Sequence, residues 1–333
     1  MSVSLGMNGF GRIGRYLLRL LADSEDIRIT AINARADNAS LAHLFKYDSV
    51  YGIFPGTVDH DDNGIIINGR HIEVTRCKTG EWEWARLGID IAVETTGTLK
   101  KREDAAQHLQ CGAKKVVVSA PCKEADATIV MGVNDDIYDA AAHTVLSAAS
   151  CTTNCLAPVA KVLNDAFGIR HGLMTTIHSY TMSQRILDGS HKDLRRARAA
   201  CVSMIPTSTG AAKALALVVP ALKGKLDGMA VRVPTPNVSL VDLTCELERD
   251  ADAASVNAAL KAASEGPMKD NMGYCEEPLV SVDFNGSTCG GVVDSLLTAV
   301  MDKRMLKLII WYDNESGFTN QLARLLRKVA ASL

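Results

Sequence analysis

The chain has 333 residues, of which 47% are hydrophobic and 22% charged, and its formal net charge is −2 at pH 7. This balance is typical of a soluble globular protein of two domains and excludes a mostly disordered chain. The chain also lacks the excess of basic residues that a general nucleic-acid binder needs. None of its apolar runs approaches the ~18 residues that are needed to span a membrane.

The first residues lack the basic and apolar segments of a signal peptide. The nine cysteines are scattered through the chain, without CxxC pairs or the Cys/His spacing of a metal site. These features predict a protein of a reducing, cytoplasmic compartment that binds no metal, no membrane and, as its primary partner, no nucleic acid.

The first 150 residues alternate between predicted strands and predicted helices. Residues 4–8 and 27–33 are expected to be strands, and the helix between them carries Ile13, Leu17 and Leu21 on one face. Asn68-Gly69 between β-rich runs predicts a hairpin. Further strands are expected at 89–94, 115–119 and 144–148, with a helix at 101–110. This order predicts a Rossmann-type, parallel dinucleotide-binding domain over residues 1–150.

The rest of the chain predicts a different architecture. A helix is expected from Cys151, because apolar residues recur at helical spacing as far as Phe167. Longer strands are expected at 173–179, 230–233, 239–247 and 305–312, with helices near 211–218 and 253–263. We therefore expect an α+β catalytic domain with a mainly antiparallel sheet over 151–314. A C-terminal helix within 315–333 is expected to dock back onto the first domain.

Gly9, Gly11 and Gly14 form the pattern G-x-G-x-x-G between the first strand and the first helix. Such a turn brings the backbone close to a pyrophosphate and directs the N–H groups of the helix N-terminus at it. The second strand ends in Ala34 and Arg35, where NAD-type sites carry an acid that binds the ribose 2′-hydroxyl. A small residue followed by an arginine favours the 2′-phosphate of NADP.

Cys151 lies at the predicted start of a helix, where free N–H groups and the helix dipole lower the pKa of a thiol. The sequence therefore predicts a reactive thiolate at this position, while Cys155 one turn further on is expected to pack in the core. A nucleophilic cysteine needs a base nearby in space. His178, at the end of a predicted strand, is the best of the eight histidines. From spacing alone, a structural role for His178 is an equal alternative.

Positive charge concentrates at residues 191–198, which indicates either a phosphate-binding loop or a solvated charged face. Thr209 and Gly210 open a predicted helix, which is a second candidate anion site. Arg232 lies inside an apolar strand, which favours a fixed anionic partner. Two anion sites beside a cysteine nucleophile suggest a phosphorylated substrate and a second phosphate.

Seven stretches in this order resemble the phosphorylating glyceraldehyde-3-phosphate dehydrogenases of bacterial and plastid type, and together they span the chain. They are NGFGRIGR (8–15), SCTTNC (150–155), HSYT (178–181), DLRRARA (193–199), PTSTGAAK (206–213), RVPTPN (232–237) and WYDNE (311–315).

The resemblance implies that Cys151 is the nucleophile and His178 the base. It implies cofactor contacts at the glycine loop and at Arg12, Ile13, Ser119 and Asn314. It implies one phosphate site formed by Ser150, Thr152, Thr209 and Gly210, and another formed by Thr181, Arg196 and Arg232. It also implies a homotetramer in which the long, polar and basic segment 180–206, which includes residues 191–198, reaches across a subunit interface. Gly189-Ser190 in that segment replaces the Leu-Pro of NAD-type members, so Ser190 again favours NADP.

The implied reaction is the reversible conversion of D-glyceraldehyde 3-phosphate and inorganic phosphate to 1,3-bisphosphoglycerate, with NADP preferred over NAD. Erythrose-4-phosphate dehydrogenase shares the nucleophile and is an alternative. The segments RVPTPN and WYDNE argue against an acyl-phosphate reductase such as aspartate-semialdehyde dehydrogenase. A non-catalytic RNA- or partner-binding role stays open as a secondary function.

Overall fold

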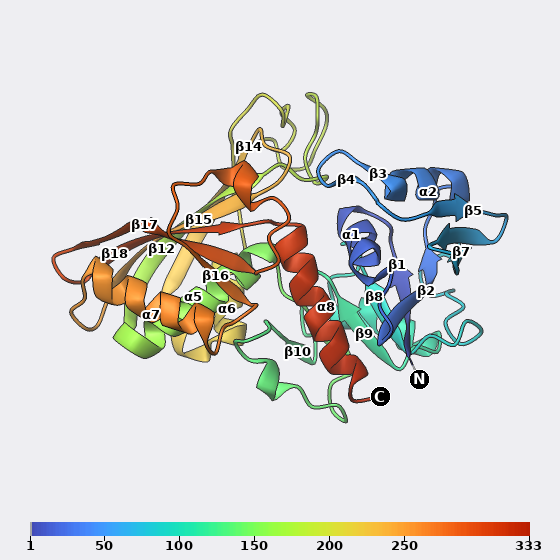
Figure 1. Ribbon diagram of the computed structural model, residues 1–333, viewed down its shortest axis with the longest axis horizontal. Coiled ribbons are helices and arrows are strands. Elements are labelled where there is room, and N and C mark those ends of the chain that lie inside the picture. Colours follow the sequence, from blue (N-terminus) through green and yellow to red (C-terminus); the bar gives the residue numbers. More distant parts are fainter. Residues whose placement is uncertain (1) are drawn as a thin grey trace. The chain divides into compact units, whose positions relative to one another are not determined.

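The computed structural model describes residues 2–333, which divide into two compact units (Figure 1). Unit 1 comprises the chain up to Ile129, together with Asp135–Ala149 and Leu322–Leu333. Unit 2 comprises Val130–Asn134 and Ser150–Gln321. Helix α8 (Ser316–Ala330) therefore begins in unit 2 and ends in unit 1.

Unit 1 contains a nine-stranded sheet in the order β10-β11-β9-β8-β1-β2-β7-β6-β5. All neighbours pair in parallel except β5/β6 and β6/β7, which form an antiparallel edge. Strand order reverses at β1, which lies between β2 and β8, and such a switch point is where dinucleotides bind in this architecture. The strands are β1 (Val3–Asn8), β2 (Ile27–Asn33), β5 (Val58–His60), β6 (Gly64–Ile67), β7 (Arg70–Thr75), β8 (Ile91–Glu94), β9 (Lys115–Val118), β10 (Ala127–Thr128) and β11 (Val145–Ser147).

The predicted hairpin is confirmed as β6 and β7. Asn68 and Gly69 have φ of 50° and 76°, the left-handed conformation that a two-residue hairpin turn requires. A separate two-stranded sheet joins β3 (Tyr47–Asp48) and β4 (Gly52–Ile53).

The helices of unit 1 confirm one prediction and correct another. Helix α1 (Arg12–Leu21) buries Leu17 and Leu21, as its apolar stripe predicts. The helix expected at 101–110 is divided into α3 (Arg102–Ala105) and α4 (Gln107–Gln110). The division falls at Ala106, whose carbonyl accepts a hydrogen bond from the N–H of Leu109, three residues further on, as in a tighter turn. The sequence predicts no bounds for helix α2 (Asn38–Lys46), and the Asp37 side chain caps it by accepting from Ser40 N at 2.8 Å. A short 3-10 helix, η1, covers Asp135–Ile137.

Unit 2 contains a seven-stranded sheet in the order β13-β14-β12-β15-β18-β17-β16. Four of its neighbouring pairs are antiparallel and two, β12/β14 and β16/β17, are parallel. The mainly antiparallel sheet confirms the predicted fold class. The strands are β12 (Ile169–Ser179), β13 (Ile205–Ser208), β14 (Leu226–Val233), β15 (Ser239–Leu247), β16 (Met272–Cys275), β17 (Gly291–Met301) and β18 (Met305–Tyr312).

Strict alternation of buried residues along β15 gives this sheet one apolar face. Helix α5 (Cys151–Phe167) packs there with Leu156, Val159 and Leu163 fully buried. The remaining helices of unit 2 are α6 (Ala211–Val218), α7 (Ala253–Glu265), and the 3-10 helices η2 (Pro220–Leu222) and η3 (Ser281–Phe284). No helix within residues 2–333 is long and apolar enough to cross a membrane.

Candidate active site

Cys151 is the first residue of α5, and two features of the local sequence place it there. Ala149 has a φ of 59°, and this left-handed turn redirects the chain after β11. Ser150 then caps α5, because its Oγ accepts a hydrogen bond from Thr153 N at 3.1 Å. The thiol therefore lies at a helix N-terminus, and it is half-buried. Cys155, one turn further, is fully buried, as expected.

His178 lies near the end of β12 and faces the start of α5. Its Nε2 is 3.5 Å from Cys151 Sγ, although the two residues are 27 positions apart in the chain. Its Nδ1 lies 2.7 Å from the carbonyl oxygen of Ser179. A proton on Nδ1 would leave the lone pair of Nε2 facing the thiol, which is the arrangement of a general base.

The environment of this pair sets both protonation states. Burial, joined by the positive charge of Arg232, lowers the pKa of His178 to about 3, so the imidazole is neutral near pH 7. Burial raises the pKa of the Cys151 thiol, and this outweighs the lowering by Arg232, the Thr152 hydroxyl and nearby backbone N–H groups. The expectation of a lowered thiol pKa is therefore wrong for this environment, because desolvation exceeds the stabilisation at the helix N-terminus.

Arg232 reaches the same pair from β14, where it is the register partner of His178. Its Nη1 lies 2.5 Å from His178 Nδ1 and donates to the Ser179 carbonyl at 3.0 Å. These contacts are with an imidazole and a carbonyl rather than with the anionic partner that the sequence suggested. Its Nε is buried and has no hydrogen-bond partner within residues 2–333. The Nε–H group of Arg232 is therefore a buried donor without an acceptor, and a bound anion would supply one.

Arg196 lies close enough to Arg232 for its charge to lower the pKa of the Arg232 guanidinium, although burial is the larger cause. Arg196 Nε donates to Thr207 Oγ1 at 2.9 Å and forms an ion pair with Asp193 at 3.5 Å. Thr207 lies on β13, which pairs with β14 and so brings the two arginines together. Two neighbouring guanidinium groups favour binding of a phosphate, which relieves their repulsion.

The other predicted phosphate residues lie at three positions of unit 2. Thr181 Oγ1 is 2.9 Å from Ser183 Oγ in the loop that follows β12. Thr152 Oγ1, in the first turn of α5, is 2.9 Å from the hydroxyl of Tyr312. Gly210 caps α6 without a side-chain hydrogen bond, and the Thr209 hydroxyl accepts from Ala211 N at 3.2 Å.

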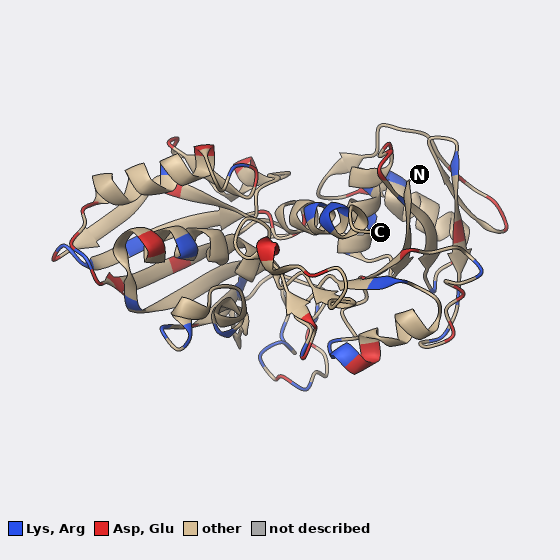
Figure 2. Cartoon of the chain, turned by 90° about the horizontal axis from the view of Figure 1, so that it is seen from below, with Lys and Arg blue, Asp and Glu red and all other residues tan. Residues whose placement is uncertain are grey.

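The basic loop, residues 180–204, contains no helix or strand. Two of its arginine side chains interact with other groups of the same loop. Arg185 donates to the Ser190 carbonyl at 3.0 and 2.8 Å, and Arg198 pairs with Asp188 at 3.1 Å. Figure 2 shows acidic and basic residues interspersed along both units, in keeping with the small net charge.

In unit 1, the start of α1 fits a dinucleotide pyrophosphate. Gly9 has a φ of 103°, and a Cβ there would lie 2.9 Å from Thr96 N. Gly11 caps α1 without a side-chain hydrogen bond, and the space around its missing Cβ is open. The guanidinium of Arg12 forms a two-pronged ion pair with Asp48 at 2.5 and 3.1 Å. The glycine loop thus presents backbone to a ligand while the arginine side chain is turned to a carboxylate.

The tip of β2 carries no acidic side chain. Ala34 is half-buried and Arg35 is exposed, and the following acid, Asp37, caps α2. Ser119 follows β9, and its N–H donates to the Glu94 carbonyl at 2.9 Å. In unit 2, the buried Asn314 accepts from Ser239 Oγ at 2.9 Å.

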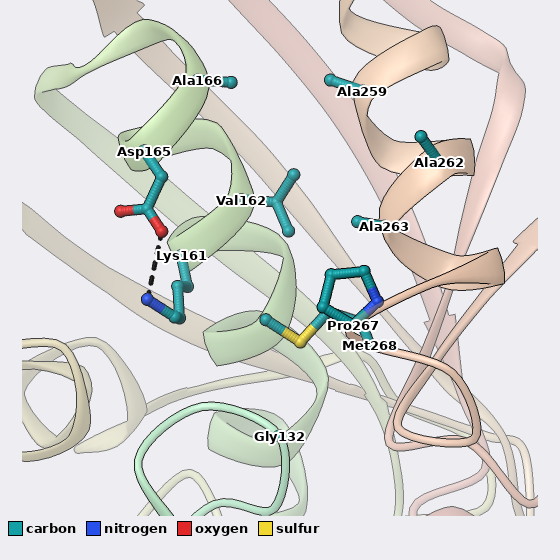
Figure 3. A pocket seen from close by; sticks show the side chains of 10 residues that line it. All are labelled: Gly132, Lys161, Val162, Asp165, Ala166, Ala259, Ala262, Ala263, Pro267 and Met268. Atoms are coloured by element: carbon teal, nitrogen blue, oxygen red, sulfur yellow. Dashed lines mark hydrogen bonds and ion pairs between the residues drawn. The ribbon is translucent and has the colours of Figure 1, made fainter.

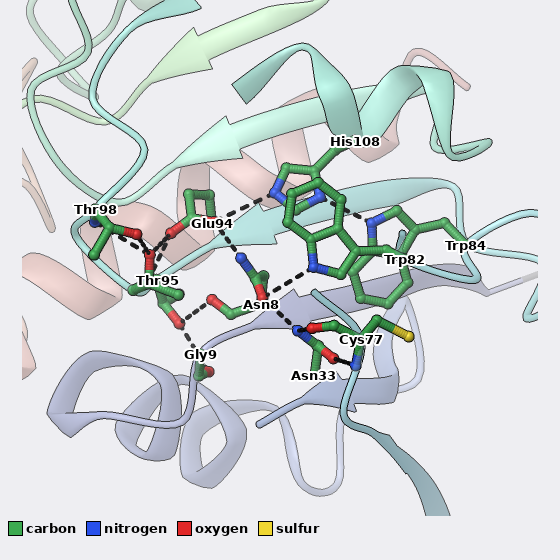
Figure 4. Close-up of polar contacts among 11 residues, drawn as sticks. Asn8, Gly9, Asn33, Cys77, Trp82, Trp84, Glu94, Thr95, Thr98 and His108 are labelled. Atoms are coloured by element: carbon green, nitrogen blue, oxygen red, sulfur yellow. Dashed lines mark hydrogen bonds and ion pairs between the residues drawn. The ribbon is translucent and has the colours of Figure 1, made fainter. Parts of the chain in front are cut away.

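A buried polar network that the sequence did not predict lies next to the glycine loop (Figure 4). Asn8 Oδ1 accepts from Asn33 Nδ2 at 2.9 Å and from Trp82 Nε1 at 3.2 Å. Asn8 Nδ2 donates to Glu94, which also contacts His108. One feature of the sequence could have indicated this network: the apolar run at 91–93 is followed directly by Glu94. A carboxylate at the end of a buried strand needs hydrogen-bond partners.

A shallow groove of about 580 Å³ lies between α5 and α7 (Figure 3). Its lining is mainly alanine, proline and methionine, and its one ion pair joins Lys161 and Asp165 at 3.0 Å. It lies along the later turns of α5, on the order of 15 Å from Cys151 along the helix. Within residues 2–333, no group of three or more His, Cys, Asp or Glu side chains could hold a metal ion.

Comparison with known proteins gives matches in both units. The family description "Glyceraldehyde 3-phosphate dehydrogenase, NAD binding domain" matches residues 3–102, and the C-terminal domain of the same family matches residues 150–314. The chain is 57% identical to the glyceraldehyde-3-phosphate dehydrogenase of Geobacillus stearothermophilus over 332 residues, which cover 99% of each chain. It is 56% identical to glyceraldehyde-3-phosphate dehydrogenase 1 of Bacillus subtilis over 331 residues, again 99% of each chain. Identity to the enzyme of Streptomyces coelicolor is 52% over 328 residues, 98% of each chain.

Proposed function

The chain belongs to the glyceraldehyde-3-phosphate dehydrogenase family of NAD-dependent oxidoreductases, and on that basis we propose that Cys151 and His178 carry its chemistry. The reaction is the reversible oxidation and phosphorylation of D-glyceraldehyde 3-phosphate to 1,3-bisphosphoglycerate. The observation that carries the proposal is the 3.5 Å contact between Cys151 Sγ and His178 Nε2, beside the buried Arg232.

The reaction begins with a neutral thiol and a neutral imidazole. As the Cys151 sulfur attacks the aldehyde carbon, the thiol proton passes to His178 Nε2 and the carbonyl oxygen becomes an oxyanion. Backbone N–H groups at the start of α5 stabilise this charge. His178 returns the proton to give a hemithioacetal hydroxyl, and it takes that proton again as a hydride leaves the same carbon. A bound nicotinamide would supply the acceptor for this hydride.

The product of that step is a thioester on Cys151. An oxygen of inorganic phosphate attacks the thioester carbonyl, the carbon–sulfur bond breaks, and the thiolate leaves with the electron pair. The acyl phosphate departs, and the thiolate regains a proton from His178. The positive charge of Arg232, which partly offsets the burial-driven rise in the pKa of Cys151, stabilises the leaving thiolate.

Two phosphate sites serve this cycle. Arg232 supports the first, because its buried Nε has no partner and Arg196 adds a second positive charge nearby. Arg232, Arg196 and Thr181 would bind one phosphate group. The starts of α5 and α6 support the second site, which Ser150, Thr152, Thr209 and Gly210 would form.

The cofactor's pyrophosphate would bind at the start of α1, to backbone N–H groups of the glycine loop, Arg12 and Ile13. We assign the Arg12 contact to its backbone because Asp48 holds its side chain. Ser119 and Asn314 would contact the nicotinamide half.

NADP would be preferred over NAD. Ala34 leaves the tip of β2 without a carboxylate that would repel a 2′-phosphate, and the exposed Arg35 offers a charge-assisted partner. Ser190, in the exposed basic loop, would donate to the 2′-phosphate in a neighbouring subunit.

The assembly would be a homotetramer, as in the family. The basic loop supports this, because several of its large apolar side chains are mostly exposed, and contiguous exposed apolar surface marks an interface. They are Met182, Leu187, Leu194, Val202 and Met204. All nine cysteines are free, which suits a reducing cytoplasm.

Steady-state assays test the activity directly. The wild-type protein should oxidise glyceraldehyde 3-phosphate in the presence of inorganic phosphate, and Cys151→Ala should abolish turnover. His178→Asn should lower kcat by ~10²–10⁴-fold, the usual worth of a positioned base. A wild-type preference for erythrose 4-phosphate, or phosphate-independent turnover, would overturn the assignment.

A further inference from the structure

A buried carboxylate lies directly beneath the glycine loop of unit 1 (Figure 4). Glu94, the last residue of β8, is 1% exposed, and its register partner on β1 is Asn8, the residue before Gly9. Glu94 Oε2 accepts from Asn8 Nδ2 at 2.6 Å and from His108 Nε2 at 3.3 Å. Its Oε1 accepts from the Thr96 backbone N–H at 2.8 Å and from the Thr96 hydroxyl.

The surrounding rings fix the roles of these groups. Trp84 Nε1 donates to His108 Nδ1 at 2.9 Å. An indole N–H can only donate, so His108 Nδ1 carries no proton and Nε2–H points at Glu94. Both Glu94 oxygens are therefore acceptors in every described contact, and the carboxylate is held from several sides. A buried network in which every donor and acceptor is hydrogen-bonded is rigid, because any other side-chain orientation would leave a polar group without a partner.

Thr95 continues the same segment and holds the glycine loop itself. Its N–H donates to the Asn8 carbonyl at 2.9 Å, and its hydroxyl lies 3.0 Å from that carbonyl and 2.9 Å from the carbonyl of Gly9. Helix α1 also packs closely against the glycine loop at Gly14. A Cβ on Gly14 would lie 2.8 Å from the Gly9 carbonyl and 3.1 Å from Thr95 Oγ1.

We propose that Glu94 and Thr95 are positioning residues for cofactor binding: from β8 they fix the backbone of Asn8 and Gly9, so that the start of α1 is ready for the pyrophosphate. This rests on the dinucleotide binding proposed above. Neither residue is assigned a contact with the cofactor, and both act through the loop. A loop that is ordered beforehand loses less conformational entropy on binding, which increases affinity.

The test compares two threonines of the same unit in the full-length protein. Thr95→Val removes the hydroxyl that holds the loop and keeps the side-chain shape, and Thr95→Ser restores the hydroxyl. Thr75→Val is the matched control, because Thr75 Oγ1 donates to Asn33 Oδ1 at 3.0 Å in the same network but does not bond the loop. The probe is ADP-ribose, which contains the pyrophosphate, and the readout is its Kd by isothermal titration calorimetry.

Thr95→Val should raise the Kd for ADP-ribose about tenfold, and Thr95→Ser should bind within about twofold of the wild type. Thr75→Val should keep the wild-type Kd, and Cys151 should react with iodoacetamide at the wild-type rate in all three variants. An unchanged Kd in Thr95→Val, or equal weakening in Thr75→Val, would overturn the proposal. The second result would indicate a purely structural role.

Glu94→Gln provides a second variant if Thr95→Val does not fold. It places an amide against groups that donate, so the Kd should again rise, and a wild-type Kd would count against the proposal. If the wild-type protein itself fails to bind ADP-ribose, the proposed cofactor site is wrong. If the wild type binds and the variants match it, only the positioning role is wrong.

Discussion

Arg232 Nη1 lies 2.5 Å from Nδ1 of His178, and the same Nδ1 lies 2.7 Å from the Ser179 carbonyl. A ring nitrogen can accept from the guanidinium or donate to the carbonyl, but it cannot do both. The proposed base role of Nε2 requires the second arrangement, in which His178 Nδ1–H and Arg232 Nη1 both donate to the Ser179 carbonyl. Burial is the main cause of both pKa shifts, and the positive charge of Arg232 adds to the lowering of the pKa of His178 and partly offsets the rise in the pKa of Cys151. Arg232 is thus linked to the nucleophile and the base, in addition to its place in the proposed phosphate site.

The first prediction concerns Arg232→Leu. Loss of the positive charge should raise the pKa of Cys151 further, so the rate of iodoacetamide inactivation at a given pH should fall and its pH profile should move to higher pH. The KM for glyceraldehyde 3-phosphate should also rise. Arg198→Leu is the control, because Arg198 is an exposed loop arginine paired with Asp188. Identical inactivation profiles for wild type and Arg232→Leu would show that Arg232 does not act on the thiol.

The second prediction concerns stability at acid pH. The folded-state pKa of His178 is lowered to about 3, whereas an unfolded histidine titrates near 6.5. Between these values the unfolded state binds one more proton, so His178 should reduce stability by about 1.4 kcal/mol for each unit that the pH falls. His178→Asn removes this contribution. Urea unfolding at pH 7.5 and 5 should show a smaller acid-induced loss in His178→Asn, and parallel losses would contradict the burial of a neutral imidazole.

The third prediction separates two glycines of the same loop. Gly9→Ala should lower both stability and cofactor affinity, because Gly9 has a φ of 103° and its Cβ would meet Thr96 N at 2.9 Å. Gly11→Ala should keep the wild-type unfolding midpoint, since no atom lies within 4 Å of its Cβ position. It should nevertheless weaken NAD and NADP binding, because the new methyl group would enter the pyrophosphate site. Tight cofactor binding by Gly11→Ala would place the pyrophosphate elsewhere.

The fourth prediction concerns cofactor choice. The wild type should have a higher kcat/KM with NADPH than with NADH, and Ala34→Asp combined with Ser190→Pro should move the ratio toward NADH. One charge-assisted hydrogen bond contributes about 1.5–3 kcal/mol, so the ratio should shift tenfold or more. The single variants Ala34→Asp and Ser190→Pro, measured separately, show how much each position contributes to the shift. A wild type that strongly prefers NADH would show that these positions do not set the preference.

Elements with strict periodicity could be predicted almost to the residue. The bounds of β2, β15, β18 and α6 agree with those expected, because each has a clean alternation or an apolar stripe. Other elements gave weaker signals. The bounds of helix α2, which follows the cap Asp37, could not be predicted, and β16 and β17 begin with small or mixed residues.

The geometry of the site depends on strand register, which local sequence does not specify. Arg232 meets His178 because β12 and β14 are parallel and these two residues are register partners. Glu94 meets Asn8 for the same reason on β8 and β1, across 86 positions of the chain. The direction of the Cys151 pKa shift was also beyond sequence reasoning, because the helix N-terminus was evident but the degree of burial was not.

A single-turnover experiment shows whether Cys151 carries the acyl group during the reaction. The enzyme is mixed with glyceraldehyde 3-phosphate and NADP in the absence of inorganic phosphate, and the quenched protein is analysed by peptide mass spectrometry. We expect a burst of NADPH with one acyl group per subunit as a thioester on Cys151, and addition of phosphate should release it as the acyl phosphate. A burst that leaves Cys151 unmodified, or an acyl group on another residue such as Cys77 or Cys201, would contradict the assignment of Cys151 as the nucleophile.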